Sequence, residues 1–179
     1  MTDFELPESM TLRPTRRPVV GTSEFRSAMS SMASSVCIVS AQRGEEVVGR
    51  TVTAVLSLSA TPPALLVSID IMSRLADVIA KTGGFSLALL AEEQTELADA
   101  FAGKVKAAER FKLGRWGKWP SGHPMLSGAV TVMDCDVIGA IETGTHVLFA
   151  GGIVEVETDA ARKPLIWQQR HYRGISPID

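Results

Sequence analysis

The chain has 179 residues and a mass of 19.2 kDa, a size that fits one compact domain. Eighteen Lys and Arg against twenty Asp and Glu give a formal net charge of −2. Proteins that bind nucleic acid by neutralising phosphates need a basic face, so this balance argues against a nucleic-acid partner. Hydrophobic residues make up 45% and charged residues 21% of the chain, which is typical of a folded protein rather than a disordered one.

Cysteine usage favours a reducing compartment, and hydropathy argues against a membrane span. Cys37 and Cys135 are far apart in the sequence, so they form neither a CxxC pair nor a zinc-site spacing, and no metal is expected. The longest uncharged stretch, residues 51–69, is interrupted by Pro62 and Pro63 and makes a poor membrane span. The sequence therefore predicts a cytoplasmic protein that does not associate with membranes.

The N-terminal segment differs from the rest of the chain. Residues 11–18 are basic and proline-rich, but no apolar region of a secretory signal follows them. We expect residues 1–20 to form a flexible arm and residues 21–179 to form a single domain.

Hydrophobic periodicity predicts short helices alternating with strands. Up to Pro63 the expected elements are a helix from Thr22, strands over 36–41 and 47–55 joined by a turn at 42–45, and a less regular stretch over 57–61. Beyond Pro63 they are a strand over 64–69, a helix over 73–83, a strand over 85–91, a helix over 92–101, a long functional loop over 104–124, strands over 129–142 and 146–157, and a short strand over 164–167. Ser73 is a preferred N-cap and Gly83 a preferred helix stop.

These elements indicate an α+β protein dominated by antiparallel strands. Consecutive strands joined by hairpins favour a closed or half-closed barrel over a doubly wound sheet. No GxGxxG or Walker loop is present, and Gly151-Gly152 lies inside a predicted strand, where it indicates a bulge. A Rossmann dehydrogenase is therefore not expected.

The chain is poor in side chains that catalyse reactions unaided. It has three histidines and neither a GxSxG nor an HExxH motif, which favours a bound cofactor. Two segments have the composition of an anion-binding cradle, residues 49–54 and residues 70–74. In the second, a helix N-terminus with Ser73 and Arg74 would suit a phosphate; the simpler alternative is that Ser73 only caps the helix while Arg74 faces solvent.

Several segments, taken together and in order, resemble the flavin reductase-like family over roughly residues 23–175. The longest are FRSAMSSMASSVCIVSA (25–41), GRTVTAVLSLSATPPALLVSID (49–70) and SRLADVIAKTGGFSLALLA (73–91), and shorter ones include ERF (109–111), HPMLSGAV (123–130) and PLIWQQRHY (164–172). Members of this family are short NAD(P)H:flavin oxidoreductases with an FMN-binding split barrel, and many serve two-component monooxygenases.

The resemblance implies a six-stranded antiparallel barrel in a homodimer, with flavin near the subunit interface. The residues it places along the flavin ring and ribityl chain are Arg50, Thr51, Val52, Thr53, Ala54 and Ser57. Those near the phosphate are Asp70, Ser73 and Arg74, with Arg110 and Phe111 at the rim. Tyr172 falls in a segment that, in relatives, closes over the pyridine nucleotide.

His146 is the residue that the resemblance places beside the nicotinamide, and it is the one catalytic candidate. In many relatives the preceding turn reads Gly-Asp-His, whereas here it reads Gly144-Thr145-His146. The acidic neighbour is missing, which bears on the choice between NADH and NADPH.

The function implied is an NAD(P)H-dependent flavin reductase. It would transfer a hydride from NADH or NADPH to FMN, or to FAD, and supply the reduced flavin to a partner monooxygenase. Two alternatives stay open at this point. One is an enzyme that holds FMN tightly and reduces a specific substrate such as a corrinoid, and the other is a flavin-binding module without catalysis.

Overall fold

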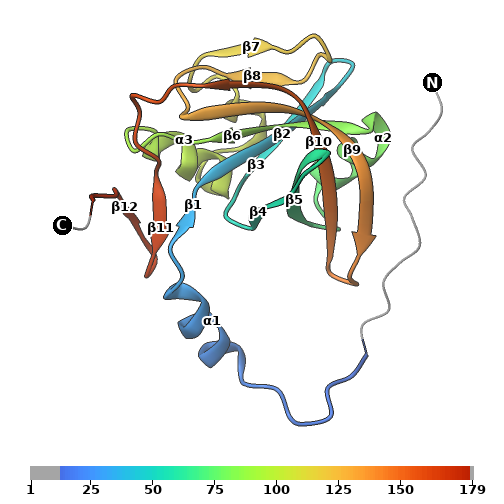
Figure 1. The fold of residues 1–179 in the computed structure, drawn as a ribbon, viewed down its shortest axis with the longest axis vertical. Coiled ribbons are helices and arrows are strands. Elements are labelled where there is room, and N and C mark those ends of the chain that lie inside the picture. The colour runs from blue at the N-terminus through green and yellow to red at the C-terminus, as the bar shows by residue number, and fades with distance from the viewer. Residues whose placement is uncertain (1–12, 178–179) are drawn as a thin grey trace.

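A single antiparallel sheet of seven strands organises the molecule (Figure 1). The structure, a computed structural model, describes residues 13–177. In the first part of the chain the elements are α1 (Thr22–Ser30), β1 (Ser34–Ser35), β2 (Cys37–Arg43), β3 (Glu46–Val52), β4 (Val55–Ala60), β5 (Pro63–Asp70), α2 (Arg74–Thr82) and β6 (Gly84–Leu89). They continue with α3 (Thr95–Asp99), a π-helical turn (Ala100–Lys104), α4 (Ala107–Arg110), β7 (Trp116–Lys118), β8 (Pro124–Leu126), β9 (Thr131–Glu142), β10 (His146–Thr158), β11 (Ile166–Gln168) and β12 (His171–Arg173).

The large sheet is open, with β3 at one edge and β4 at the other. Its strand order is β3-β2-β6-β9-β10-β5-β4, and all neighbours are antiparallel. Only Thr53 and Ala54 separate the ends of the two edge strands, so the Cα atoms of Val52 and Val55 lie at most about 11 Å apart. The sheet therefore curls until its edges approach at this link. This confirms the antiparallel α+β class, while the expected six-stranded barrel is corrected to seven strands that do not close.

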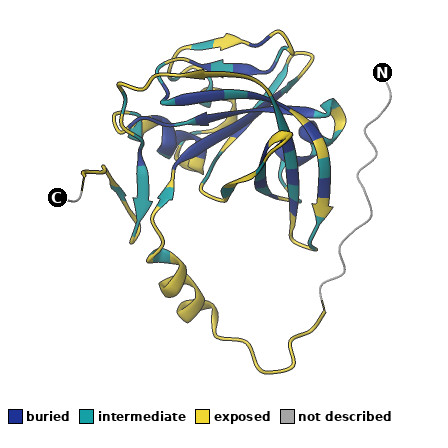
Figure 2. Ribbon diagram, in the orientation of Figure 1, coloured by how far each residue is buried: buried dark blue, intermediate teal, exposed yellow. Residues whose placement is uncertain are grey.

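Both faces of the central strands are buried, which gives the domain two hydrophobic clusters (Figure 2). Successive residues of a strand point to opposite faces, so neighbours in β2 serve different clusters. Val39 packs inside the curl of the sheet with α2, and Ile38 packs on the outer face with Phe101 and Trp119. The helix α2 is amphipathic as predicted, and it buries Leu75 and Ile79 against the first cluster.

Several local predictions are confirmed, and others are wrong. The turn after β2 is a two-residue hairpin in which Gly44 has a φ of +59°, and the register of β9 with β10 shifts at Gly151, as a bulge requires. The strand predicted over 47–55 is broken at Thr53, and the stretch thought irregular forms β4. The helix predicted over 92–101 starts at Thr95, and the loop predicted over 104–124 contains α4 and β7.

The N-terminal helix α1 extends away from the body of the domain (Figures 1 and 2). None of its residues is buried, and Phe25 and Met29 are exposed. Residues 13–20 are exposed and contain no helix or strand, while the rest of the predicted arm, residues 1–12, lies outside the described residues. Within the part of the chain that is described, no helix is long and apolar enough to cross a membrane.

Candidate functional site

Two adjoining cavities lie where β3 meets the N-terminus of α2. The first has a volume of about 290 Å³ and extends toward α4, and the second, of about 210 Å³, extends toward β5 and the start of β10. Arg50 and Ser73 line both cavities, so the two spaces meet at these side chains. One extended ligand with a polar junction therefore fits this region better than two unrelated small ones.

Most of the site residues predicted from the sequence line these two cavities. Those of the first cavity are Arg50, Ser73, Arg74, Arg110 and Phe111. Those of the second are Arg50, Thr51, Val52, Thr53, Ala54, Asp70, Ser73 and His146. The strand β3, the turn before α2 and the start of β10 thus bring together residues that are almost 100 positions apart in the sequence.

Ser57 and Tyr172 line neither of these two cavities. Ser57 lines an apolar groove along β4, which meets the second cavity at Thr53, Ala54 and Ser68. The Tyr172 hydroxyl donates a hydrogen bond to Asp99 Oδ1 at 2.8 Å, and its ring packs against Trp167 with centroids 5.0 Å apart. Burial, together with the bond to Asp99, raises the pKa of Tyr172 to about 12, so this phenol stays protonated at neutral pH. In this structure it anchors the β11–β12 hairpin to α3.

The N-terminus of α2 has the geometry of an anion site. Ser73 is its N-cap, and the Ser73 hydroxyl accepts a hydrogen bond from the amide of Ala76 at 3.2 Å, as predicted. Arg74 does not simply face solvent. Its guanidinium donates to Glu46 Oε1 at 2.6 Å and also pairs with Asp77. Ser73 already accepts from the amides of Ala76 and Asp77, so the amides of Arg74 and Leu75 are those that this first turn can offer to a ligand.

The hydroxyl of Thr51, the threonine of β3, is already hydrogen-bonded within the protein. Thr51 Oγ1 donates a hydrogen bond of 2.6 Å to the carbonyl of Ala98 in α3. Its proton is therefore used within the protein, and only its lone pairs remain for a ligand. The same bond fixes β3 against α3, so the wall of the second cavity is rigid at Thr51.

His146 faces an acidic residue across the sheet instead of beside it in the sequence. It is the register partner of Asp70, and directly opposed side chains of antiparallel strands have Cβ atoms about 5 Å apart. Its Nδ1 lies 3.0 Å from the Thr145 hydroxyl. The amide of Ile71 donates to the carbonyl of Thr145 at 3.1 Å, which ties the turn to the end of β5. The Asp that precedes this histidine in many relatives is absent here, but Asp70 places a carboxylate opposite His146 on the neighbouring strand.

Sequence reasoning missed Ser68, which lines the second cavity. It lies two residues before Asp70 on β5, and residues two apart on a strand share a face. The predicted role of Asp70, combined with this period, could have identified it. Gly49, which lines the first cavity, belongs to the predicted cradle over residues 49–54, whereas Val48 beside it carries no comparable signal in the sequence.

The two thiols take no part in this site. Both cysteines are free and buried, and burial raises the pKa of Cys37 and of Cys135 to about 12. Thiols with such pKa values are protonated and unreactive at neutral pH, so both cysteines act as small core residues. Among residues 13–177, no group of three or more His, Cys, Asp or Glu side chains is arranged to hold a metal ion.

Comparison with known proteins identifies the family. Residues 29–176 match the flavin reductase like domain. The chain belongs to the flavin reductase-like family. A further match is the NADH-dependent FMN reductase AsuE2 of Streptomyces nodosus subsp. asukaensis, 36% identical over 157 residues, which cover 86% of this chain and 83% of that protein.

Two other relatives support the assignment of this chain to the flavin reductase-like family. The reductase component of the FADH(2)-dependent resorcinol hydroxylase of Rhizobium sp. (strain MTP-10005) is 33% identical over 158 residues, covering 86% of this chain and 87% of that protein. A crystal structure described as a flavin reductase from Haemophilus somnus 129PT superposes with a TM-score of 0.84 at 31% identity, covering 87% of this chain and all of that one.

The cavities of this flavin reductase-like chain suit a flavin nucleotide. No Asp or Glu side chain lines the first cavity, which has three arginines and the amides of a helix N-terminus. That donor set matches a phosphate. The second cavity combines Thr51 and Val52 of β3 and the following Thr53 with Ser68 and Asp70. Such a mixture of apolar walls and few polar groups is typical of an orienting site for a ring.

Proposed function

We propose that this chain is an NAD(P)H-dependent flavin reductase that acts on FMN or FAD. The observation that carries the proposal is the pair of adjoining cavities, one cationic and one of mixed polarity, joined at Arg50 and Ser73. Membership of the flavin reductase-like family supports it, as do relatives named for NADH-dependent FMN reduction.

The protein contributes position rather than acid–base chemistry. When bound, flavin supplies the hydride acceptor for NAD(P)H. The α2 amides and Arg50 hold the phosphate, while Val52 at the end of β3 and Thr53 just after it orient the ring and exclude water from one side. His146 at the start of β10 contacts the pyridine nucleotide. Alignment of two bound reactants supplies much of a rate enhancement without any proton transfer, which fits the few ionisable groups in the second cavity.

We further propose that the reduced flavin passes to a partner monooxygenase. The relative from Rhizobium sp. is the reductase component of a hydroxylase, which supports this destination for the product. Cys37 and Cys135 are free thiols, which fits a location in the cytoplasm, where disulfides are rare.

We also propose that the active form is a homodimer. The exposed Phe25 and Met29 give α1 an apolar stripe with no partner in the monomer. The same chain has an open apolar groove of about 830 Å³, lined by Met32 just after α1 and by Leu56 and Leu65 of the β4–β5 hairpin. Two copies related by a twofold axis would cover both surfaces at once, as exposed apolar patches of this kind generally require.

Steady-state NADH oxidation, with NADPH in parallel, tests the proposed reaction. FMN and then FAD are titrated into the purified protein, and the rate should rise and saturate with added flavin. A protein that binds flavin yet shows no NAD(P)H oxidation at any flavin concentration would be a binding module. A tightly bound FMN that turns over only when a corrinoid is added would indicate the enzyme with a specific acceptor. Either result would refute the proposed reductase.

A further inference from the structure

The first cavity contains two arginines whose charges are not neutralised. Arg50 extends from β3 and Arg110 from the end of α4, and both line this space. Within the described residues, neither guanidinium forms an ion pair. Arg110 donates only to backbone carbonyls, to Val105 at 3.0 Å and to Gly49 at 3.4 Å.

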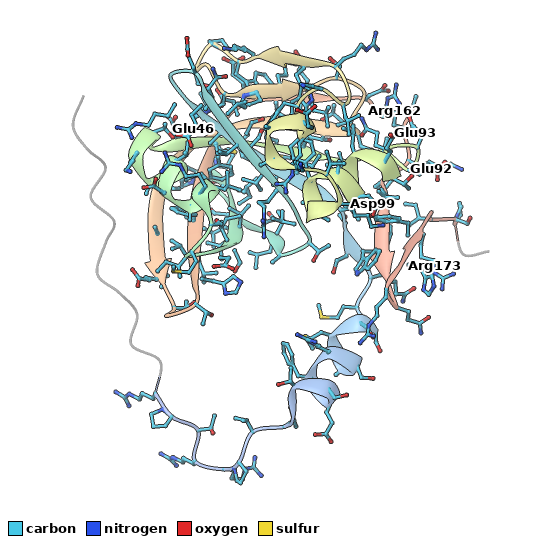
Figure 3. The ribbon with its side chains drawn as sticks, turned by 180° about the vertical axis from the view of Figure 1, so that it is seen from behind. Glu46, Glu92, Glu93, Asp99, Arg162 and Arg173 are labelled. Atoms are coloured by element: carbon cyan, nitrogen blue, oxygen red, sulfur yellow. The ribbon has the colours of Figure 1, made fainter. Side chains whose placement is uncertain are left out.

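The third arginine of the cavity, Arg74, is paired with carboxylates. Glu46 binds Arg74 through both carboxylate oxygens, and Asp77 adds a second carboxylate. Figure 3 shows Glu46 beside α2, across the molecule from the Arg162–Glu93 ion pair, which is satisfied in the same way. Of the three arginines of the first cavity, Arg74 is thus neutralised by carboxylates, while Arg50 and Arg110 form no ion pair with the described residues.

Keeping these two cations together is unfavourable in the free protein. Arg110 is half-buried, and its burial, together with the positive charge of Arg50, lowers the pKa of Arg110. No carboxylate lines the cavity to offset this. An anion placed between the guanidiniums would remove the repulsion and make charge-assisted hydrogen bonds to both.

The position of Arg110 separates this anion from the phosphate at the helix N-terminus. Arg50 and Ser73 stand at the junction of the two cavities, whereas Arg110 lines the first cavity alone. Beside Arg110 the wall is apolar, formed by Val48 and Phe111. The site beyond the junction therefore offers a cation for a second phosphate and an apolar surface for a flat ring.

We propose that the first cavity is a subsite for the adenosine phosphate half of FAD, so that this chain binds FAD more tightly than FMN. The proposal rests on the flavin reductase function proposed above and narrows its substrate. FMN ends at the phosphate near Ser73, while FAD continues with a second phosphate and an adenosine that reach Arg110, Val48 and Phe111.

Equilibrium titrations with FMN and with FAD, followed by flavin fluorescence, test the subsite. Wild-type protein should bind FAD more tightly, with a steeper weakening as salt is added. Arg110→Gln should raise the Kd for FAD about tenfold, the loss of a charge-assisted hydrogen bond, and raise that for FMN by much less. Because Arg110→Gln also loses its backbone contacts, Arg110→Lys, which keeps the positive charge, serves as a second variant and should raise the Kd for FAD less than Arg110→Gln does.

Lys112→Gln is the matched control. It removes one positive charge two residues from Arg110, but its side chain is 70% exposed, pairs with Glu109 and does not line the cavity. Both flavin dissociation constants should stay unchanged in this variant. A thermal melt of each variant separates loss of folding from loss of binding.

Three results would overturn the subsite. Equal weakening of FAD and FMN would mean that the arginines serve only the flavin phosphate. A raised KM for NADH with an unchanged FAD-to-FMN ratio would assign the cavity to the hydride donor. Equal affinity of wild-type protein for both flavins, with normal reductase activity, would remove the subsite and leave the proposed function standing. Binding of neither flavin would instead refute the proposed function itself.

Discussion

At the scale of single residues, His146 is the side chain whose removal should affect the reaction most directly. It lines the second cavity opposite Asp70, and the Thr145 hydroxyl contacts its Nδ1 at 3.0 Å. His146→Ala should lower kcat for NADH oxidation by about ten- to a hundredfold, because a misplaced donor loses its alignment, while the Kd for flavin changes less. Stopped-flow reduction and flavin titration measure the two quantities separately.

Thr143→Ala is the control for disruption of the turn. It removes the hydrogen bond of 3.0 Å that Thr143 Oγ1 donates to the carbonyl of His146, but it keeps the imidazole. Near-normal reduction by this variant would attribute the loss in His146→Ala to the ring itself. Release of flavin from His146→Ala, with an unchanged reduction rate at saturating flavin, would show that the histidine is structural.

His123 should make the stability of the protein depend on pH. Burial lowers the pKa of His123 below its ordinary value of 6.5, although Asp134 and Asp136 oppose this shift. Its Nδ1 accepts a hydrogen bond of 3.2 Å from the amide of Gln42, which requires that nitrogen to be unprotonated. Below about pH 6.5 the unfolded chain binds a proton that the folded chain does not, so stability present above that pH is lost as the pH falls.

Urea unfolding between pH 8 and pH 5 measures this dependence. The free energy of unfolding should fall with a slope of at most about 1.4 kcal/mol per pH unit from this single group. His123→Gln retains an acceptor for the Gln42 amide but does not titrate, so its stability should decline less over the same range. Parallel curves for the two proteins would show that His123 makes no contribution.

At the scale of elements, the sequence predicts type and order better than it predicts the ends. The hairpin at Gly44 and the helix between Ser73 and Gly83 carry strong local signals, namely a glycine turn and a capped amphipathic pattern. The break at Thr53 carries none, because β-branched residues continue on both sides of it. Only the curl of the sheet, which moves the chain from one edge to the other, separates β3 from β4.

In the candidate site too, features set by local sequence could be predicted, and features set by strand pairing could not. The N-cap of α2 could be predicted from Ser73 alone, since capping is local. The pairing of Arg74 with Glu46, and of His146 with Asp70, depends on which strands become neighbours, and no local pattern encodes that. The resemblance to a family supplied most of the site residues, but it did not indicate that Arg74 is neutralised or that Tyr172 binds Asp99.

The β9–β10 pair offers a direct test of close packing at the bulge. A Cβ atom at Gly151 would lie 2.5 Å from Cζ of the fully buried Phe85 and 3.0 Å from Cβ of Cys135. Gly151→Ala should therefore lower the free energy of unfolding by about 1–3 kcal/mol, as overpacking of a core does. In Gly139→Ala the nearest contact would be Cβ of Ala150 at 3.9 Å, so chemical denaturation should find this control unchanged or slightly more stable.

At the scale of the whole molecule, α1 is difficult to explain for an isolated chain. A nine-residue helix in which no residue is buried is marginal in water, and this one also exposes Phe25 and Met29. The groove lined by Met32 and Leu56 is exposed in the same chain. A second copy of the chain that covers these surfaces would account for the exposed helix and for the exposed groove. This is the reason for proposing that the active form is a homodimer.

Replacing the apolar stripe of α1 with charge should therefore dissociate the protein. Phe25→Asp combined with Met29→Asp places two carboxylates where a partner would bury apolar side chains, and burying unpaired charge is strongly unfavourable. Light scattering coupled to size exclusion should give twice the chain mass for wild-type protein and the single chain mass for the double variant. Ser27→Asp, a charge on the opposite side of the same helix, should remain a dimer. A monomeric wild type, or a double variant that stays dimeric, would show that α1 does not mediate association.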